Sequence, residues 1–336
     1  MKYIVCEKPG SLVLGDMEEP QRAKGEVLLR VNKIGVCGTD LHAYGGNQPF
    51  FTYPRVLGHE IASEVLEADE SSPLRPGDKV AVIPYLHCGT CVACRKGKTN
   101  CCRNIRVFGV HTDGGMKEKI VLPEAFLIPV PGLTDKQIAV LEPLAIGAHA
   151  IRRAEVTDRD SVVVVGCGPI GIGILKLAKL RGADVIAIDT NEQRLQFVKE
   201  RIGIDKIVKA GENAVAEVAA LTDDDLADVV FDATGNKRAM EAGTDYMAHG
   251  GRYALVGLFN GELEFTHPRI HAKETTLLCC RNATPEDFEH VISVIGDFPV
   301  NEYVTHESGL KDAIANFEKW TDPAEGVIKG MIDFNN

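Results

Sequence analysis

The chain has 336 residues, enough for about two domains, and its 45% hydrophobic and 25% charged residues are an ordinary globular composition. The formal net charge of −11 argues against a nucleic-acid-binding protein, which normally carries a basic surface. No apolar run reaches the length of a membrane-spanning helix, so we expect neither a nucleic-acid nor a membrane partner. Ten cysteines without a secretory signal predict a reducing, cytoplasmic location.

The first 130 residues have the pattern of a small antiparallel β-barrel. Short apolar runs at 26–31, 60–68, 78–85 and 117–123 are separated by Gly, Pro and Asp turns. Two long loops, 35–58 and 86–115, hold most of the Cys and His residues. We therefore expect metal ligands in these loops.

A candidate catalytic zinc site combines Cys37 with His59. Thiolate and imidazole are natural zinc ligands, and a catalytic zinc ion needs about three protein ligands and one open position. No suitably placed cysteine remains for the third ligand, so Glu60 and Glu142 are both candidates. One carboxylate would bind the metal, and the other would hold its water. A lone barrel histidine is more often a hydrogen-bonded core residue, but this mixture of N, S and O donors favours zinc.

A second cysteine set, Cys88, Cys91, Cys94 and Cys102, has the spacing of a closed structural zinc site. Four thiolates can surround zinc tetrahedrally and leave no open position. Gly89, Gly97 and Asn100 supply the turns that a loop around a metal ion needs. Cys101 adjoins Cys102, so spacing alone leaves both open as the last ligand. Two zinc ions per chain are expected.

From Thr134 the pattern becomes helical, with a helix over 136–154 that Pro143 should kink or divide. Strands and helices then alternate, which predicts a parallel sheet with helices on both faces. Thr284 and Pro285 begin a further helix, and the tail after residue 300 fits the alternation poorly, so we assign it to the first domain. The expected strands are 162–165, 184–188, 228–232, 253–256 and 275–280, and the expected helices are 170–180, 192–202, 214–221 and 237–248.

A glycine-rich turn follows the run of four valines and opens a helix, as in dinucleotide-binding proteins. Its glycines allow a tight turn, close approach of a pyrophosphate, and close helix–strand packing. Asp189 ends the next strand, where a carboxylate would accept from the adenosine ribose and repel a 2′-phosphate. NAD is therefore favoured over NADP, although nearby Arg194 could pair with a phosphate. The expected cofactor residues are Gly166, Gly168, Pro169, Ile170, Gly171, Asp189, Arg194 and Gly257.

Catalytic zinc, structural zinc and a dinucleotide turn, in this order, indicate a zinc-dependent nicotinamide dehydrogenase. The chain resembles the zinc-containing medium-chain dehydrogenases over nearly its full length, in the motifs 37-CGTDLH-42, 58-GHE-60, the four-cysteine loop, 142-EPL-144 and 166-GCGPIG-171. This resemblance implies a GroES-like β-barrel catalytic domain (1–145 and 282–336), a Rossmann NAD-binding domain (146–281), and a dimer or tetramer. It also implies that Cys102 is the structural ligand, that Thr39 relays a proton, and that His42 connects this relay to solvent.

Glu142, where simple alcohol dehydrogenases carry cysteine, resembles the polyol and sugar-acid branch of the family. The segments 45–60, 109–115 and 273–288 resemble most closely the L-galactonate dehydrogenases, which oxidise carbon 5. Ser63, Cys279 and Cys280 depart from the family pattern, and these departures bear on the identity of the substrate and not on the reaction class. Threonine-, sorbitol- or glucose-type dehydrogenases, a non-catalytic NAD-binding sensor, and a zinc-ribbon nucleic-acid module are the alternatives.

We expect NAD-linked oxidation of a secondary hydroxyl to a ketone, with a polyhydroxylated sugar acid as substrate. Two loops and the sheet edge supply hydrogen-bonding candidates. A pocket that hydrogen-bonds hydroxyl groups rejects analogues that lack them. An aldonate also needs a cation. The candidate contacts are Tyr44, Asn47, Gln48, His111 and Asp113, with Arg281 or Arg55 for the carboxylate.

Overall fold

The computed structural model describes residues 1–47 and 51–335 and divides the chain into two compact units. The first comprises Met1–Glu142, Thr284–Ile295 and Val300–Asn336, and the second comprises Pro143–Ala283 and Gly296–Pro299. In the described part of the chain, no helix is long and apolar enough to cross a membrane.

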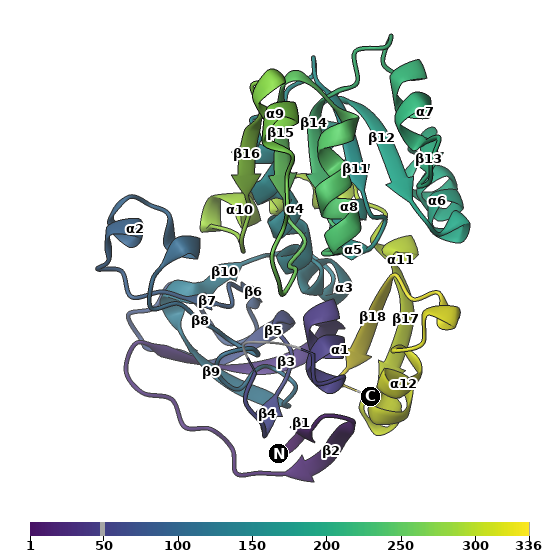
Figure 1. Ribbon diagram of the computed structural model, residues 1–336. Coiled ribbons are helices and arrows are strands. Elements are labelled where there is room, and N and C mark those ends of the chain that lie inside the picture. Colours follow the sequence, from purple (N-terminus) through teal and green to yellow (C-terminus); the bar gives the residue numbers. More distant parts are fainter. Residues whose placement is uncertain (48–50, 336) are drawn as a thin grey trace. The chain divides into compact units, whose positions relative to one another are not determined.

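The first unit is built on a seven-stranded sheet in the order β10-β6-β5-β3-β18-β17, with β9 also paired to β3 (Figure 1). A three-stranded sheet, β2-β1-β4, and the β7–β8 pair complete its strands. Its core is formed by inward-facing aliphatic side chains, among them Val27, Leu29 and Val31 of β3. The strands are β1 (Lys2–Lys8), β2 (Ser11–Asp16), β3 (Glu26–Val36), β4 (Arg55–Val56), β5 (Glu60–Glu67), β6 (Lys79–Val82), β7 (Tyr85–Leu86), β8 (Arg106–Val107), β9 (Lys119–Pro123), β10 (Leu127–Pro129), β17 (Val304–Gly309) and β18 (Lys329–Asp333).

Short helices complete the first unit. Its last two strands, β17 and β18, follow the second unit in the sequence and join the sheet that contains β3. Strand β18 pairs antiparallel with β3, with Gly330 opposite Val36. Thr284 and Asp287 form a capping box at the start of α10, as the cap, proline and acids of this segment predicted. The helices are α1 (Gly38–Tyr44), α2 (Val92–Arg95), α3 (Asp135–Ala139), α10 (Pro285–Val294), α11 (Val300–Tyr303) and α12 (Ala313–Lys319).

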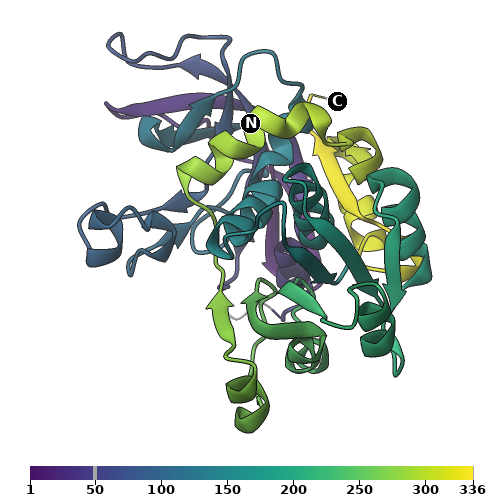
Figure 2. The ribbon, with the colours of Figure 1, turned by 90° about the horizontal axis from the view of Figure 1, so that it is seen from above.

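The second unit is a six-stranded parallel sheet in the order β13-β12-β11-β14-β15-β16. This is the order of a Rossmann fold, and helices cover both faces (Figure 2). Val162–Val165 of β11 are buried, as expected for a central strand covered on both sides. The strands are β11 (Ser161–Val165), β12 (Asp184–Asp189), β13 (Lys206–Lys209), β14 (Ala227–Asp232), β15 (Met247–Leu255) and β16 (Thr276–Cys279).

Among the helices of the second unit, one expected helix is too long and one predicted division is confirmed. The helix expected at 237–248 ends at Ala242, and β15 already begins at Met247. The helical run after Thr134 is divided, as predicted from Pro143: α3 ends at Ala139 and α4 begins at Leu141, because proline cannot donate to the carbonyl of Ala139. The helices are α4 (Leu141–Arg153, which starts in the first unit), α5 (Pro169–Leu180), α6 (Glu192–Phe197, continued by a π-helical turn), α7 (Ala214–Ala220), α8 (Lys237–Ala242) and α9 (His267–Ala272).

Candidate functional site

Two paired strands bring Cys37, His59 and Glu60 together. Cys37 follows β3, Glu60 begins β5, and Gly35 of β3 lies opposite Glu60 in the sheet register. One ligand atom from each of Cys37, His59 and Glu60 lies within 4.8 Å of the others. The fold thus assembles thiol, imidazole and carboxylate from two separate loops into one group of possible metal ligands.

Asp40 connects the backbone at Cys37 with the backbone before His59 through hydrogen bonds. It is fully buried; its Oδ2 accepts from the Cys37 N–H at 2.9 Å, and its Oδ1 accepts from the Gly58 N–H at 3.3 Å. The same Oδ1 lies 3.8 Å from His59 Nδ1. Asp40 therefore fixes the backbone on both sides of the Cys37–His59 pair. The sequence analysis assigned it no role.

Glu142 contributes a second buried carboxylate to the first unit. The Tyr85 hydroxyl donates to its Oε1, while its Oε2 and His59 Nδ1 are buried without a hydrogen-bond partner among the described residues. Unpaired buried polar atoms are unfavourable and need an explanation. A zinc ion would account for an unpaired donor atom in such a set of sulfur, nitrogen and oxygen ligands.

The charges around this group favour a cation. Burial opposes protonation of His59, but Asp40, Cys37 and Glu142 outweigh it and raise the pKa of His59 well above its usual value. Burial also raises the pKa of Glu142 to about 7, with Glu60 acting in the same direction and His59 opposing it. His59 and Glu142 therefore tend to keep their protons, which offset the negative charge of the group. A divalent ion bound at the same place would offset that charge instead.

Lys329 on β18 is a further member of this buried group. Its side chain is 1% exposed, and its Nζ donates to Glu60 Oε1 at 2.5 Å and to Oε2 at 2.8 Å. Burial opposes the ammonium charge, but Glu60, Tyr303 and Cys37 outweigh it and raise the pKa of Lys329. Lys329 was not among the predicted site residues, although a single lysine inside the apolar run 327–332 is a signal for a paired buried charge.

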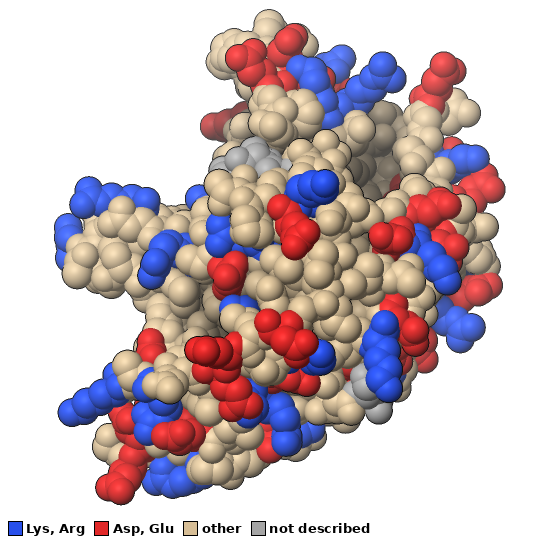
Figure 3. All heavy atoms as spheres, turned by 90° about the horizontal axis from the view of Figure 1, so that it is seen from below, with Lys and Arg blue, Asp and Glu red and all other residues tan. Residues whose placement is uncertain are grey.

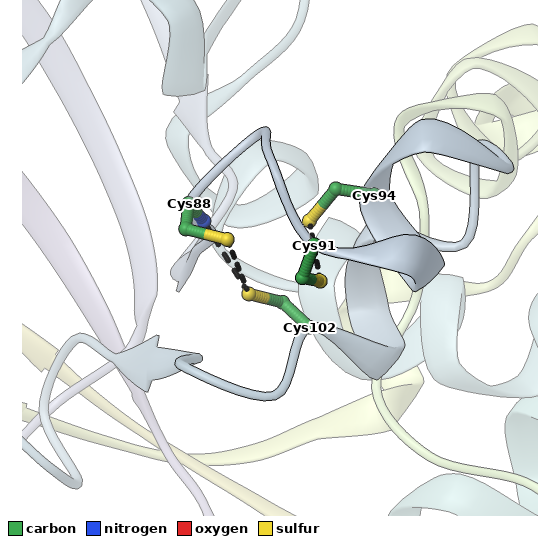
Figure 4. A group of neighbouring side chains, drawn as sticks. All are labelled: Cys88, Cys91, Cys94 and Cys102. Atoms are coloured by element: carbon green, nitrogen blue, oxygen red, sulfur yellow. Dashed lines mark hydrogen bonds between the residues drawn. The ribbon is translucent and has the colours of Figure 1, made fainter.

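The structural-zinc candidates form a second cluster in the first unit (Figure 4). The Sγ atoms of Cys91 and Cys94 are 3.5 Å apart, and those of Cys88 and Cys102 are 3.4 Å apart. Cys101 is exposed and is not part of this cluster. The structure therefore brings Cys102, not its neighbour, to the other three thiols.

The protonation of these thiols fits a metal site. Hydrogen bonds from Thr90 and loop N–H groups lower the pKa of Cys88 to about 5, and N–H groups of Cys94 and Arg103 lower that of Cys91 to about 7. Burial raises the pKa of Cys94 to about 12, with its thiol neighbours acting in the same direction. A cation would replace the remaining protons and hold all four thiolates.

The cysteine loop is also the most basic part of the chain. It stands out from the strands of its unit (Figures 1 and 2) and carries exposed Lys and Arg side chains at its surface (Figure 3). No acidic residue lies between Asp78 and Asp113. A local excess of cations stabilises thiolates, which supports the metal site further. The basic residues are Arg95, Lys96, Lys98, Arg103 and Arg106.

In the second unit, the glycine turn joins β11 to α5. Gly166 has φ +99°, a conformation that favours glycine. A Cβ at Gly171 would overlap the Gly166 carbonyl, whereas a Cβ at Gly168 would meet nothing within 4 Å. The Gly171 position therefore provides close helix–strand packing, and Gly168, with Pro169 and Ile170 behind it, leaves open backbone at a helix N-terminus.

Asp189 lies beside this turn at the end of β12 and is 8% exposed. Its Oδ2 accepts from the Cys167 N–H at 2.7 Å, and its Oδ1 accepts from the Asn191 N–H at 2.8 Å. Arg194 lies in α6, which follows directly. Gly257 packs on the backbone of Gly235, where a Cβ would overlap the Gly235 nitrogen. The bonds from Cys167 and Asn191 hold Asp189 next to the turn, and its carboxylate has lone pairs left for a ligand.

Several predicted substrate contacts already have partners within the first unit. The Tyr44 hydroxyl donates to Glu318 at 3.2 Å, and His111 Nδ1 accepts from the Val107 N–H at 3.0 Å. Asp113 Oδ1 accepts from the Val56 N–H at 3.1 Å and lies 3.6 Å from Arg55. These contacts stabilise loops, and the substrate roles remain predictions.

The other candidates are placed as follows. Thr39 is half-buried and His42 exposed, both on α1. Asn47 is exposed, and Gln48 lies outside the described residues. Arg281 belongs to the second unit.

Two family sequence models match the chain: an alcohol dehydrogenase GroES-like domain over residues 23–132 and a zinc-binding dehydrogenase domain over residues 169–297. The chain is also 42% identical to the L-galactonate-5-dehydrogenase of Escherichia coli K12, over 99% of each chain. The chain therefore belongs to the zinc-type alcohol dehydrogenase family. It is a zinc-dependent oxidoreductase that uses a nicotinamide dinucleotide, with a GroES-like barrel and a Rossmann unit.

Solved structures agree with this membership. RspB of E. coli CFT073, complexed with NADH, has a TM-score of 0.92 and 29% identity, with 99% of each chain covered. The L-idonate 5-dehydrogenase of E. coli K-12 has a TM-score of 0.90 and 26% identity, with 99% of this chain and 98% of that chain covered. The predicted family, fold class and reaction class are confirmed.

Proposed function

We propose that the protein oxidises a secondary hydroxyl of a sugar acid of the L-galactonate type to a ketone, with NAD as hydride acceptor. The full-length similarity to an L-galactonate-5-dehydrogenase carries this proposal. The two buried carboxylates at the candidate metal group support it, because oxygen donors make the surroundings of the metal more polar than a second thiolate would.

Cys37, His59 and one carboxylate would hold a catalytic zinc ion, and Cys88, Cys91, Cys94 and Cys102 a structural one. When bound, catalytic zinc supplies Lewis-acid stabilisation of an alkoxide near neutral pH. Both carboxylates stay candidates: a ligand atom of Glu60 lies within 4.8 Å of those of Cys37 and His59, but both its oxygens accept from Lys329. One oxygen of Glu142 is buried without a hydrogen-bond partner among the described residues.

Two residues of α1, Thr39 and His42, would transfer the proton that leaves the substrate hydroxyl. Thr39 directly follows the first helical residue after Cys37, so its hydroxyl can accept a proton near the metal group and pass it outward. His42 lies one turn further on and is exposed, which suits transfer to solvent. Asp40, between them, keeps Cys37 and His59 in place.

A comparison of specificity constants tests the proposed substrate class. L-galactonate-type aldonates, sorbitol-type polyols, threonine and short secondary alcohols would be compared by NADH absorbance. We expect the aldonates to have the highest kcat/KM, because a site that hydrogen-bonds several hydroxyls penalises analogues that leave its groups unpaired. A higher value for butanediol or isopropanol would contradict the polar-site argument. Equal values for neutral polyols and aldonates would contradict only anion recognition.

We also propose that the protein forms a homo-oligomer through the second unit. Strand β16 is the last strand of the sheet, so one edge of its backbone has no partner strand among the described residues, and Leu277 on it is 46% exposed. No charged residue interrupts residues 275–280 to protect this edge. Light scattering should show an oligomer that Leu277→Lys weakens; a monomeric wild-type protein would contradict this proposal.

A cytoplasmic location is proposed on the state of the cysteines. All ten have free thiols. Thiolate metal sites persist where the compartment is reducing, whereas an oxidising compartment favours disulfides.

A further inference from the structure

The cysteine loop (residues 88–106) carries more positive charge than its proposed metal ion needs. Five exposed cations lie on it, and no acidic residue lies between Asp78 and Asp113. Four thiolates around a divalent ion have a net charge of −2, so the five cations leave the loop with a net charge of +3. Stabilisation of the thiolates therefore explains only part of this charge. The five cations are Arg95, Lys96, Lys98, Arg103 and Arg106.

These cations are available to a charged molecule in solution. None of the five forms an ion pair with another of the described residues. Figure 3 shows Lys and Arg side chains on the projecting lobe that this loop forms. The rest of the chain is acidic, since the net charge of −11 would be −16 without the five cations. An anion is therefore repelled by the rest of the protein and attracted by this loop.

The loop begins beside the candidate metal group. Tyr85 lies three residues before Cys88, and its hydroxyl donates to Glu142. Strands β7 and β8 form the base of the loop, where Arg106 is paired with Leu86. Since paired strands lie about 5 Å apart, Arg106 is next to the strand whose tyrosine reaches Glu142.

The loop also ends beside this group. Gly109, three residues after Arg106, packs on the residue that precedes His59, because a Cβ at Gly109 would overlap the Gly58 carbonyl. The Gly115 N–H donates to the same carbonyl at 2.8 Å. The cysteine loop thus leaves the first unit near Glu142 and returns near His59, so its cations project from the surroundings of the candidate metal group.

We propose that the cysteine loop attracts the anionic substrate toward the candidate active site. Its positive charge raises the local concentration of the sugar-acid carboxylate without a direct bond to it. Such attraction speeds association by about tenfold or more. It weakens with salt, because the Debye length falls from about 30 Å at 0.01 M to about 8 Å at 0.15 M ionic strength. The inference rests on the proposed function, because it takes an aldonate as the substrate, and it gives the loop a role in selecting anionic over neutral substrates.

The dependence of kcat/KM on ionic strength tests this role. L-galactonate and its neutral amide, L-galactonamide, have nearly the same shape and differ in charge. NAD is kept saturating so that its own charge does not contribute. Between about 0.01 and 0.15 M ionic strength, kcat/KM of the whole protein should fall roughly fivefold or more for galactonate and less than about twofold for galactonamide. The value of kcat for galactonate should stay constant, because the loop acts on the approach of the substrate.

Charge reversal locates the effect on the loop. Lys96→Glu/Lys98→Glu should lower kcat/KM for galactonate roughly fivefold or more at low ionic strength and flatten its salt dependence. Lys96→Arg/Lys98→Arg, which keeps the charge, should behave as the wild type. Zinc content and circular dichroism check that each variant is folded and holds its metal. Lys96→Gln/Lys98→Gln, with half the change in charge, serves if the reversed pair loses zinc.

Lys311 and Lys319 provide a matched control in the same unit. Both are exposed and form no ion pair with another described residue. Lys311 lies just before α12 and Lys319 ends it, on the side of the first unit away from α2 (Figure 1). Lys311→Glu/Lys319→Glu changes the total charge of the protein by the same amount and should lower kcat/KM for galactonate less than about twofold.

Three results would overturn the inference. The first is a kcat/KM for galactonate that does not depend on ionic strength. The second is an equal loss from the loop pair and the α12 pair, which would show an effect of total charge alone. The third is an equal loss for galactonate and galactonamide in the loop pair, which would show general damage to the site. Failure of the proposed function has a different signature, since the wild type would then not oxidise galactonate at any ionic strength.

Discussion

Asp189 shapes a loop, and we propose that it also selects the cofactor. Its carboxylate accepts backbone N–H bonds from the glycine turn and from the start of α6. It is nearly buried, so its charge is poorly screened by solvent. A ligand phosphate placed beside it would meet strong repulsion, whereas a ribose hydroxyl could donate to it.

Asp189→Asn should therefore narrow the preference for NAD over NADP. The substitution keeps the shape of the side chain and one acceptor oxygen but removes the negative charge. A like-charge contact in a partly buried site amounts to about 1–3 kcal/mol, so the ratio of kcat/KM values should fall roughly ten- to a hundredfold. Both ratios are measured by NADH or NADPH formation. Similar kcat/KM values for the two cofactors in the wild type would refute the role assigned to Asp189.

At the scale of single residues, sequence reasoning found side chains whose chemistry depends on local motifs. Cys37, His59 and the four loop cysteines are of this kind, and the structure groups them. It missed Lys329 and Tyr85, because their importance comes from strand pairing between distant segments. The hydroxyl of Tyr85 and the ammonium of Lys329 acquire a role only when the sheet places them beside Glu142 and Glu60.

At the scale of elements, the β11–turn–α5 segment has one glycine required by packing and another that we expect to serve ligand binding. Gly171 has no space for a side chain, while Gly168 has open space around it. The two glycines therefore make a matched pair for mutation.

Gly171→Ala should destabilise the second unit by about 1–3 kcal/mol, because its methyl group would overlap backbone that cannot move aside. Gly168→Ala should change stability by less than about 0.5 kcal/mol. It should nevertheless weaken NAD binding about tenfold or more, since the methyl group would occupy the approach of the pyrophosphate. Thermal denaturation and NAD titration by fluorescence measure the two effects. Equal destabilisation by the two alanine substitutions would contradict the assignment of Gly171 to packing and Gly168 to NAD binding.

The cysteine loop offers a second matched pair. Cys91→Ser should lower the zinc content from two ions to one and reduce the thermal midpoint by about 5 °C or more, the effect of losing roughly 2 kcal/mol in a domain of this size. Cys101→Ser should change neither quantity, because that thiol is exposed and outside the cluster. Elemental analysis and calorimetry provide the readouts. Loss of zinc from Cys101→Ser would show that Cys101, not Cys102, is the fourth ligand.

Element boundaries were less predictable than element types. The alternation of strands and helices in the second unit followed from apolar runs, but β13 was missed because its four residues, Lys206–Lys209, include two lysines. The helix predicted over 237–248 is longer than the observed one, since Met247 and Ala248 suit a helix as well as the strand to which they belong. Tertiary pairing with β14 decides the outcome there.

At the scale of the whole molecule, the chain separates the candidate metal ligands from the predicted cofactor-binding residues. The Cys37 group and the cysteine loop belong to the first compact unit, and the glycine turn with Asp189 belongs to the second. Each unit has its own buried apolar core. Substitution of a candidate metal ligand should therefore leave NAD binding measurable, and substitution in the glycine turn should leave metal binding measurable.

Cys37→Ala should abolish turnover and leave NAD binding nearly intact. Loss of the metal removes several kcal/mol of transition-state stabilisation, which corresponds to a fall in kcat of about a thousandfold or more. The dissociation constant for NAD should change less than about twofold, because no residue of the glycine turn is altered. Steady-state kinetics and fluorescence titration give the two values. A parallel loss of both would show that the units do not act separately.

The return of β18 to the first unit has a consequence for the order of events during synthesis. The ribosome makes Cys37, His59 and Glu142 first, then the whole second unit, and only afterwards Lys329. A nascent chain can complete the Rossmann sheet while the barrel still lacks the strand beside β3. Until that strand arrives, Glu60 has no counter-ion and the edge of β3 at residues 33–36 is open. We therefore expect the unfinished barrel to be the part of the nascent chain that most needs protection from aggregation.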